Sequence, residues 1–301
     1  MTDPAPALQF SPSAALVLQL ILALVIFGVS LELSFADFRR LLSAPRPVLA
    51  ALLSQLIALP LLTYALVWVL DPAPGLALGL MMTAACPGGN MSNVLTHFSG
   101  GRTAVSMSAT TISSLISPLT TPLTFALLGG LHPSTRAALS TVQVPALELV
   151  MTIVVALVLP LLAGMTLAQK RPQLARRLQG PLRRFGLLVF FAFIAVALIA
   201  NGSVFLQVLS TLFLLVLAHN ALALACGFSM GTLFKVDEPA RRAITFETGI
   251  HNTALGLTLV FTYFPTQTSM MLVLGWWGIW HLFTGGALAW FWSRRPTASA
   301  T

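Results

Sequence analysis

Residues 86–93, Cys-Pro-Gly-Gly-Asn-Met-Ser-Asn, interrupt the stretch 75–98, which is otherwise apolar and long enough to cross a bilayer as a helix. A proline removes one backbone donor and two glycines remove side-chain support, so the helix is predicted to break at this point. A second interruption, Glu-Thr-Gly-Ile-His-Asn-Thr at 247–253, lies within the apolar stretch 243–264. Irregular backbone inside a membrane must be satisfied by protein or by a water-filled cavity, so we expect both breaks to line one cavity.

The composition around these breaks is that of a membrane protein. The chain has 301 residues, of which 57% are hydrophobic and only 8% are charged. Because a soluble domain carries about 25% charged residues, this composition excludes a cytosolic enzyme, a disordered chain and a coiled coil. The net charge of +8 comes from short basic clusters between apolar runs, so no nucleic-acid partner is expected. Cys86 and Cys226 lie within apolar runs and indicate neither a disulfide framework nor a metal site.

The apolar runs predict an all-α polytopic membrane protein with nine transmembrane helices. Spans of a β-barrel would be about ten residues long with strict alternation, a pattern that this sequence lacks. The predicted spans are 13–33, 48–70, 75–98, 103–128, 139–168, 185–200, 204–233, 243–264 and 269–292.

The positions of the two breaks predict an internal repeat. They lie in the third and eighth predicted spans, which run in opposite directions across the membrane. This arrangement is typical of inverted-topology repeats whose discontinuous helices cross near the midplane. We therefore predict an N-terminal tail at 1–12, a first repeat of four helices at 13–136 that lacks one helix, a second repeat of five helices at 137–293, and a C-terminal tail at 294–301.

The basic residues predict the orientation in the cell (inner) membrane. When the loops are assigned alternately to two sides, every Lys and Arg except Arg136 falls on the same side. Since cytoplasmic loops carry the excess of Lys and Arg, the N-terminus is expected outside and the C-terminus in the cytoplasm. The basic stretch 169–184 is interpreted as a cytoplasmic loop beside anionic lipid.

Glu247 is predicted to be the central ligand of a cation site. A carboxylate deep in a bilayer costs at least ~2.5–3.5 kcal/mol, and no Lys or Arg lies in the middle of a predicted span to pair with it. In the fourth span, hydroxyl residues at 106, 110, 113, 117 and 121 follow one helix face. Because small hard cations prefer oxygen ligands, the sequence predicts a sodium site. Its expected ligands are Ser92, Asn93, Ser106, Thr110 and Glu247.

Other chemistry remains open for the same residues. A protonated Glu247 acting with His251 would make a proton-coupled or sodium-independent carrier of organic anions. A receptor or channel-like protein without transport activity could share the fold. A zinc site built from Glu247, His219, His251 and His281 has no spacing motif to support it. A hydrolase would need a base fixed near Cys86, which the sequence does not indicate.

The segments 86–93, 106–118 and 247–252 together resemble the bile acid:sodium symporter family, and the resemblance runs from Gly28 to Gly286. The motifs Pro-Gly-Gly-x-x-Ser-Asn and Glu-x-Gly-x-x-Asn are specific in combination. The resemblance implies a core domain that holds two crossed, broken helices and a panel domain packed against it. It also implies a nine-span form, and a substrate that resembles a bile acid or a smaller anion such as pantoate or pyruvate.

The resemblance further implies ligands that the residues alone do not indicate. At the position of His251, relatives carry a glutamine, and imidazole is a poor ligand for an alkali ion. His281 would contact substrate, as would the amides of Asn90 and Asn252 beneath two half-helix N-termini. The implied second sodium site consists of Gln55, Glu247, Thr248, Ile250 and His251.

These observations lead to one prediction of function. We expect a secondary active transporter, not an enzyme, that moves an organic anion together with sodium by alternating access. Sodium would be the co-transported ion, and the other partners would be the anion and the membrane lipids. The anion is expected to be bile-acid-like, pantoate-like or another carboxylate.

Overall fold

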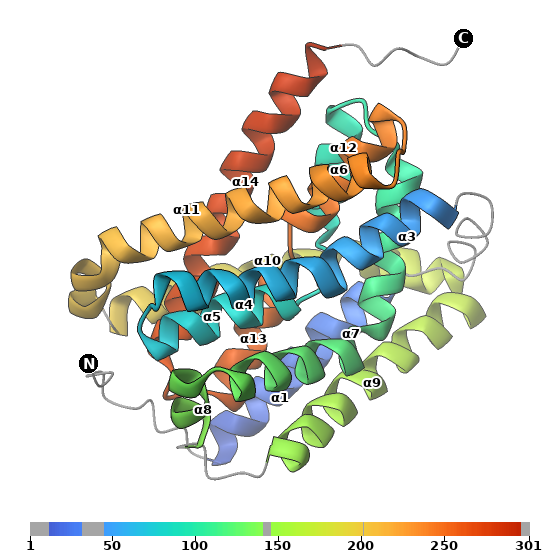
Figure 1. Cartoon of the computed structure of the whole chain (residues 1–301). Helices are drawn as coiled ribbons and strands as arrows, with labels where there is room; N and C mark the ends of the chain where they lie inside the picture. The colour runs from blue at the N-terminus through green and yellow to red at the C-terminus, as the bar shows by residue number, and fades with distance from the viewer. Residues whose placement is uncertain (1–11, 32–44, 141–145, 201, 296–301) are drawn as a thin grey trace.

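The computed structural model describes residues 12–31, 45–140, 146–200 and 202–295, and these ranges are almost entirely helical (Figure 1). Within them there is no β-strand, only an isolated antiparallel bridge between Gly88 and His251. The all-α class is therefore confirmed for the described chain. The helices are α1 (Pro12–Ser30), α3 (Pro45–Leu53), α4 (Leu59–Leu70), α5 (Pro74–Ala85), α6 (Asn90–Phe98), α7 (Thr103–Leu131), α8 (Pro133–Ser140), α9 (Ala146–Lys170), α10 (Pro172–Ala200), α11 (Gly202–Leu233), α12 (Glu238–Gly249), α13 (Thr253–Tyr263) and α14 (Thr268–Ser293), with the π-helical turn η1 (Ser54–Ala58) between α3 and α4.

Both predicted helix breaks are present. The first separates α5 from α6 at residues 86–89, and the second separates α12 from α13 at residues 250–252. Four helical segments of the described chain are long and apolar enough to cross a membrane, at 45–70, 103–131, 210–233 and 268–293. Four shorter apolar helices accompany them, at 19–30, 74–85, 156–170 and 253–263. The described helices therefore agree with a polytopic membrane protein.

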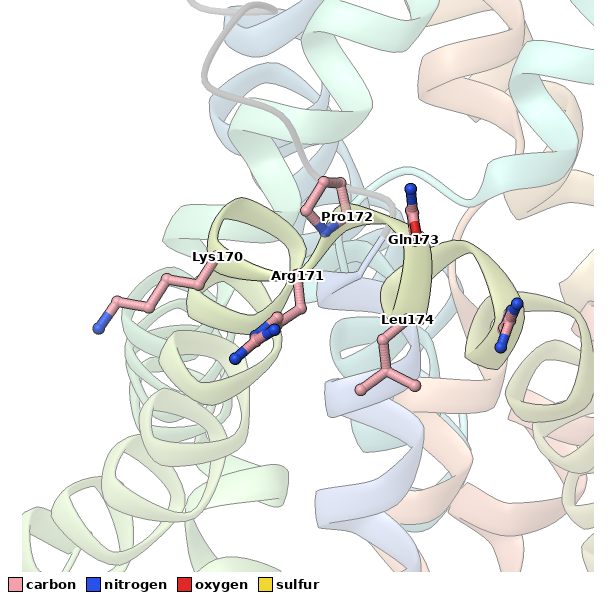
Figure 2. A pocket seen from close by; sticks show the side chains of 6 residues that line it. Lys170, Arg171, Pro172, Gln173 and Leu174 are labelled. Atoms are coloured by element: carbon pink, nitrogen blue, oxygen red, sulfur yellow. The ribbon is translucent and has the colours of Figure 1, made fainter.

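The basic stretch 169–184 differs from the prediction, because most of it is helical rather than a loop. The chain turns after Lys170, and α10 starts at Pro172, where a proline suits the first turn of a helix. The turn carries a surface hollow of about 500 Å³, and Figure 2 shows the side chains of residues 170–174 that line it. The Gln179 amide donates a hydrogen bond to the Leu31 carbonyl at 2.8 Å, which ties α10 to the end of α1.

The half-helices α5 and α13 lie in the middle of the molecule. Almost every residue of α5 and most of α13 are buried, which is expected of helices that are apolar all round. Both contribute to the largest apolar cluster, together with the first half of α14, where Trp277 is fully buried. The breaks at the ends of α5 and α13 are thus held at the centre of the bundle.

Three helices form an outer group around this centre. Helix α1 packs against α9 and α10, which also pack against each other, and Figure 1 shows α9 running alongside α1. The outer group, defined as α1, α9 and α10, contacts the central half-helix α13 through α1 and α10. Helix α10 also packs against α14. The boundary between the outer group and the central helices lies next to the second break.

Candidate ion and substrate site

The two broken helices meet through their backbones. The Gly89 N–H donates to the Ile250 carbonyl at 2.8 Å, and the Asn252 N–H donates to the Pro87 carbonyl at 2.9 Å. A buried backbone group without a partner is costly, and at membrane depth no bulk water is available to provide one. Each break therefore satisfies backbone groups that the other leaves free.

The close approach explains the two glycines. A Cβ atom at Gly88 would lie 2.1 Å from Glu247 Oε1, and one at Gly89 would lie 2.9 Å from the His251 carbonyl oxygen. Any side chain at Gly88 would therefore displace the carboxylate. The glycines do more than break the helix, because they let the opposing segment pass at contact distance.

Polar side chains from two other helices complete the backbone hydrogen bonding. The Asn220 amide of α11 donates to the Gly249 carbonyl at 3.0 Å, at the end of α12. The Thr121 hydroxyl of α7 donates to the Ala85 carbonyl at 2.9 Å, at the end of α5. Neither role is predicted by the sequence pattern. A mid-span amide such as Asn220 is the signal that could have indicated one of them.

The side chains predicted for the first sodium site converge on Glu247. Ser92 Oγ donates to Glu247 Oε2 at 2.7 Å, and Ser106 Oγ donates to the same oxygen at 2.9 Å. Thr110 Oγ1 lies 2.9 Å from both oxygens of this carboxylate. Asn93 joins the group through its Oδ1 atom, which lies 3.3 Å from Thr110 Oγ1. The structure thus brings all five predicted residues together. We call them the oxygen cage.

Glu247 has no cationic side chain as a partner within the described ranges. It is 0% exposed, and the two ion pairs found there join Arg102 to Asp237 and Arg242 to Glu238, outside the cage. The carboxylate is satisfied instead by hydroxyl donors. Carboxylate, hydroxyl and amide oxygens at such short separations are the donor set that an alkali cation prefers.

The remaining hydroxyls of α7 do not extend this cage. Ser113 donates to the Thr110 carbonyl at 3.2 Å and Ser117 to the Ser114 carbonyl at 2.8 Å, a common habit of hydroxyls in helices. Ser108 is buried, and its hydroxyl has no partner among the described residues. The predicted hydroxyl face therefore divides into ligand candidates near Glu247, residues that bond their own helix, and Thr121, which bonds the end of α5.

The second predicted sodium site lies beside the first, but protein donors already use its oxygens. Gln55, in the π-helical turn, accepts the Gly88 N–H on Oε1 at 3.0 Å. The Ile250 carbonyl accepts the backbone N–H of the crossing segment, as described above. The structure gathers the predicted residues, yet it uses Gln55 and Ile250 to hold the first break in place.

His251 fills the space between two backbone carbonyls. Its Nδ1 lies 2.9 Å from the Cys86 oxygen and its Nε2 lies 2.8 Å from the Thr248 oxygen. The ring is 2% exposed and stands edge-on to Trp277 at a centroid distance of 5.4 Å. Thr248, whose carbonyl belongs to the second predicted site, is therefore engaged by this ring.

The three predicted substrate contacts line one cavity of about 210 Å³. Asn90 and Asn252 border it at the starts of α6 and α13, where the Asn252 side chain caps α13 by accepting the Leu255 N–H at 3.1 Å. His281 borders it from α14, is 4% exposed, and has an Nδ1 atom without a partner in the described part of the chain. The cavity thus lies against two helix N-termini.

Two further residues have locations that the sequence does not predict. His219 packs in the core, because Trp277 Nε1 donates to its Nδ1 at 2.9 Å and its Nε2 lies 2.8 Å from Thr63 Oγ1. Arg183, interpreted from the sequence as part of a loop, lines the cavity from α10. The basic run 169–184 has no pattern that indicates which arginine borders the cavity.

Comparison with known proteins gives a consistent result. The model of the Sodium Bile acid symporter family matches residues 19–208. The chain is 30% identical over 275 residues to the uncharacterized sodium-dependent transporter YocS of Bacillus subtilis (strain 168), an alignment that covers 91% of this chain and 82% of YocS.

Two eukaryotic relatives are also similar. The probable sodium/metabolite cotransporter BASS2, chloroplastic, of Oryza sativa subsp. japonica is 30% identical over 285 residues, covering 91% of this chain and 63% of that protein. The hepatic sodium/bile acid cotransporter of Rattus norvegicus is 27% identical over 260 residues, covering 85% and 69% respectively. The family and these relatives are transporters and not enzymes, as the sequence predicted.

Proposed function

We propose that this chain, which belongs to the Sodium Bile acid symporter family, carries a small organic anion across the membrane together with sodium. The chain is a multi-pass membrane protein of a transporter family. The observation that carries the proposal is the oxygen cage, in which a fully buried carboxylate is surrounded by hydroxyl groups and has no cationic partner in the described chain.

The sodium ion is assigned to the cage residues Ser92, Asn93, Ser106, Thr110 and Glu247. Each hydroxyl oxygen that now donates to the carboxylate has lone pairs that can turn toward a cation. A bound sodium ion would offset the negative charge that makes a buried carboxylate costly in a membrane. It would also join α6, α7 and α12, which carry these residues.

We do not assign a second sodium ion to the set containing Gln55, Thr248, Ile250 and His251. In that set, Gln55 Oε1 and the Ile250 carbonyl oxygen each already accept one backbone hydrogen bond, which leaves each oxygen a single lone pair for a cation. His251 supplies ring nitrogens where an alkali ion needs oxygen. These residues are proposed to hold the crossing of the two breaks.

The anion is placed in the cavity between the N-termini of α6 and α13. Unpaired N–H groups and the helix dipoles make such termini attractive to negative charge. Asn90, Asn252 and His281 offer polar side chains at this cavity. Sodium binding at the cage would fix the crossing of the two breaks, from which α6 and α13 start. The ion and the anion would therefore stabilise the same arrangement of these two helix N-termini.

The architecture follows from the same proposal. The chain would form nine spans in inverted repeats, 13–136 and 137–293, with the tail 1–12 outside and the tail 294–301 in the cytoplasm. The outer group would serve as the panel and the central helices as the core. A rocking movement of one against the other would expose the midplane site to each side in turn.

Transport in proteoliposomes tests this function. An inward sodium gradient is expected to drive concentrative uptake of a short carboxylate, whereas an equal potassium gradient is not. Uptake driven equally well by a pH gradient without sodium would instead support the proton-coupled alternative at Glu247 and His251. Absence of flux for every carboxylate tested would favour a receptor of the same fold.

A further inference from the structure

The substrate cavity has two walls of different origin. One wall comes from the central helices and contains the first turns of α6 and α13 and the His281 ring. The other comes from the outer group and contains Val25 and Val29 of α1 together with Leu182 and Arg183 of α10. A ligand in this cavity therefore contacts both groups at once.

The central wall can balance one negative charge. Two helix N-termini of at least nine residues face the cavity, each with a partial positive charge at its first turn. His281 adds a ring nitrogen that is buried and has no partner among the described residues. A buried polar atom without a partner calls for a hydrogen-bonding group, and a ligand in this cavity can supply one to the His281 ring.

Arg183 supplies a full positive charge on the opposite wall. Across the described ranges its guanidinium has no hydrogen-bond or ion-pair partner, although other arginines such as Arg102 and Arg242 are paired. The side chain is exposed and borders the cavity. An arginine guanidinium binds a carboxylate in a bidentate manner, and a lysine cannot reproduce that geometry.

We propose that Arg183 binds a second acidic group of the transported anion, so that the preferred substrates are short dicarboxylates. This inference rests on the proposed transport function and specifies its substrate class. The first carboxylate would lie at the α6 and α13 N-termini and the second at Arg183. Apolar side chains of the outer-group wall, such as Val25 and Leu182, would contact the carbon chain.

The size of the cavity agrees with a short chain. Pockets for drug-sized ligands measure roughly 300–1,000 Å³, whereas this cavity measures about 210 Å³. A steroid-sized amphipath is therefore a poor match for it. A four-carbon or five-carbon diacid places two charges at its ends with few carbons between them.

Equilibrium binding to the purified full-length protein in sodium-containing buffer tests the assignment. Succinate and butyrate have the same number of carbons and differ in one carboxylate, and titration calorimetry measures the affinity of each. The wild-type protein is expected to bind succinate at least tenfold more tightly than butyrate. Arg183→Gln should weaken succinate binding at least tenfold and butyrate binding much less, and Arg183→Lys should restore only part of the preference.

Arg184→Gln is the matched control, because Arg184 is the exposed neighbour that does not line the cavity. It should leave both affinities unchanged. Equal weakening of succinate and butyrate in Arg183→Gln, or no preference for succinate in the wild-type protein, would overturn the assignment. Sodium-driven butyrate uptake without a diacid preference would refute only this inference, whereas absence of sodium-driven uptake of any carboxylate would refute the proposed function as well.

Discussion

Replacement of Glu247 by glutamine tests the oxygen cage most sharply, because it keeps the shape of the side chain and removes its charge. In the wild-type protein the carboxylate accepts hydrogen bonds from Ser92, Ser106 and Thr110 at 2.7 to 2.9 Å. Hydroxyl groups can donate to the amide oxygen of Glu247→Gln and accept from its nitrogen. We therefore expect the variant to fold, and to lose no stability in sodium-free buffer, since a buried charge has been removed.

The expected magnitude follows from ligand linkage. A ligand at one hundred times its Kd stabilises the folded state by about 2.7 kcal/mol, and a tenfold rise in Kd reduces this to about 1.4 kcal/mol. Loss of the only anionic ligand should weaken sodium binding by at least that factor. The stabilisation by sodium should therefore fall by about half or more in Glu247→Gln.

Thermal denaturation in detergent measures this effect. The Tm in NaCl is compared with the Tm in KCl at equal ionic strength, so that general salt effects cancel. Asp71→Asn provides a matched control, because Asp71 is an exposed carboxylate outside the cage and its left-handed conformation (φ 41°) suits asparagine. The reasoning is refuted if Glu247→Gln keeps the full difference between NaCl and KCl, or if Asp71→Asn loses it as well.

Three further substitutions probe neighbouring features. Thr110→Ala removes a hydroxyl 2.9 Å from both carboxylate oxygens and should raise the half-saturating sodium concentration about tenfold or more. Ser108→Ala removes a hydroxyl that has no partner in the described chain and should leave that concentration unchanged. Equal effects of the two substitutions would contradict the assignment of Thr110 to the cage. His251→Gln places an amide oxygen where the ring nitrogens now lie, beside the cage, and should raise the Hill slope for sodium from near one toward two. An unchanged Hill slope would show that the His251 ring is not what excludes a second sodium ion. Gly88→Ala places a Cβ 2.1 Å from Glu247 Oε1 and should weaken sodium binding. Gly286→Ala adds a Cβ with no neighbouring atom within 4 Å and should leave sodium binding unchanged. Sodium titrations that give the same affinity for both variants would refute this expectation.

The breaks and the cage could be predicted because their chemistry is local and conspicuous. Proline and glycine within an apolar run break a helix wherever the run lies, and Pro87 to Gly89 do so between α5 and α6. A carboxylate in a span without a neighbouring cation needs oxygen-rich surroundings, and Ser106 and Thr110 share the helix face that provides them. The only packing that these inferences required was the crossing of the two breaks, which their positions in oppositely directed spans already indicate.

The remaining features depend on tertiary contacts that the sequence does not display. The hydrogen bond from Asn220 to Gly249 joins two helices, and no pattern in either one predicts the pairing. The π-helical turn at Ser54–Ala58 contains neither proline nor glycine, and its one local signal is Pro60, which cannot donate to the Leu56 carbonyl. Arg183 was assigned to a loop because six basic residues in a short stretch suggest solvent, yet α10 is already helical from Pro172 and turns this arginine toward the cavity.

Sodium influx that depends on the anion is the direct measure of symport through Glu247. Proteoliposomes containing the wild-type protein are exposed to radioactive sodium, with or without an external carboxylate that the protein transports, and sodium influx is measured. Because Glu247 is proposed to bind the co-transported ion, the carboxylate should stimulate sodium influx in the wild-type protein and fail to do so in Glu247→Gln. Carboxylate uptake without any stimulated sodium influx in the wild-type protein, or equal stimulation in Glu247→Gln, would contradict this proposal.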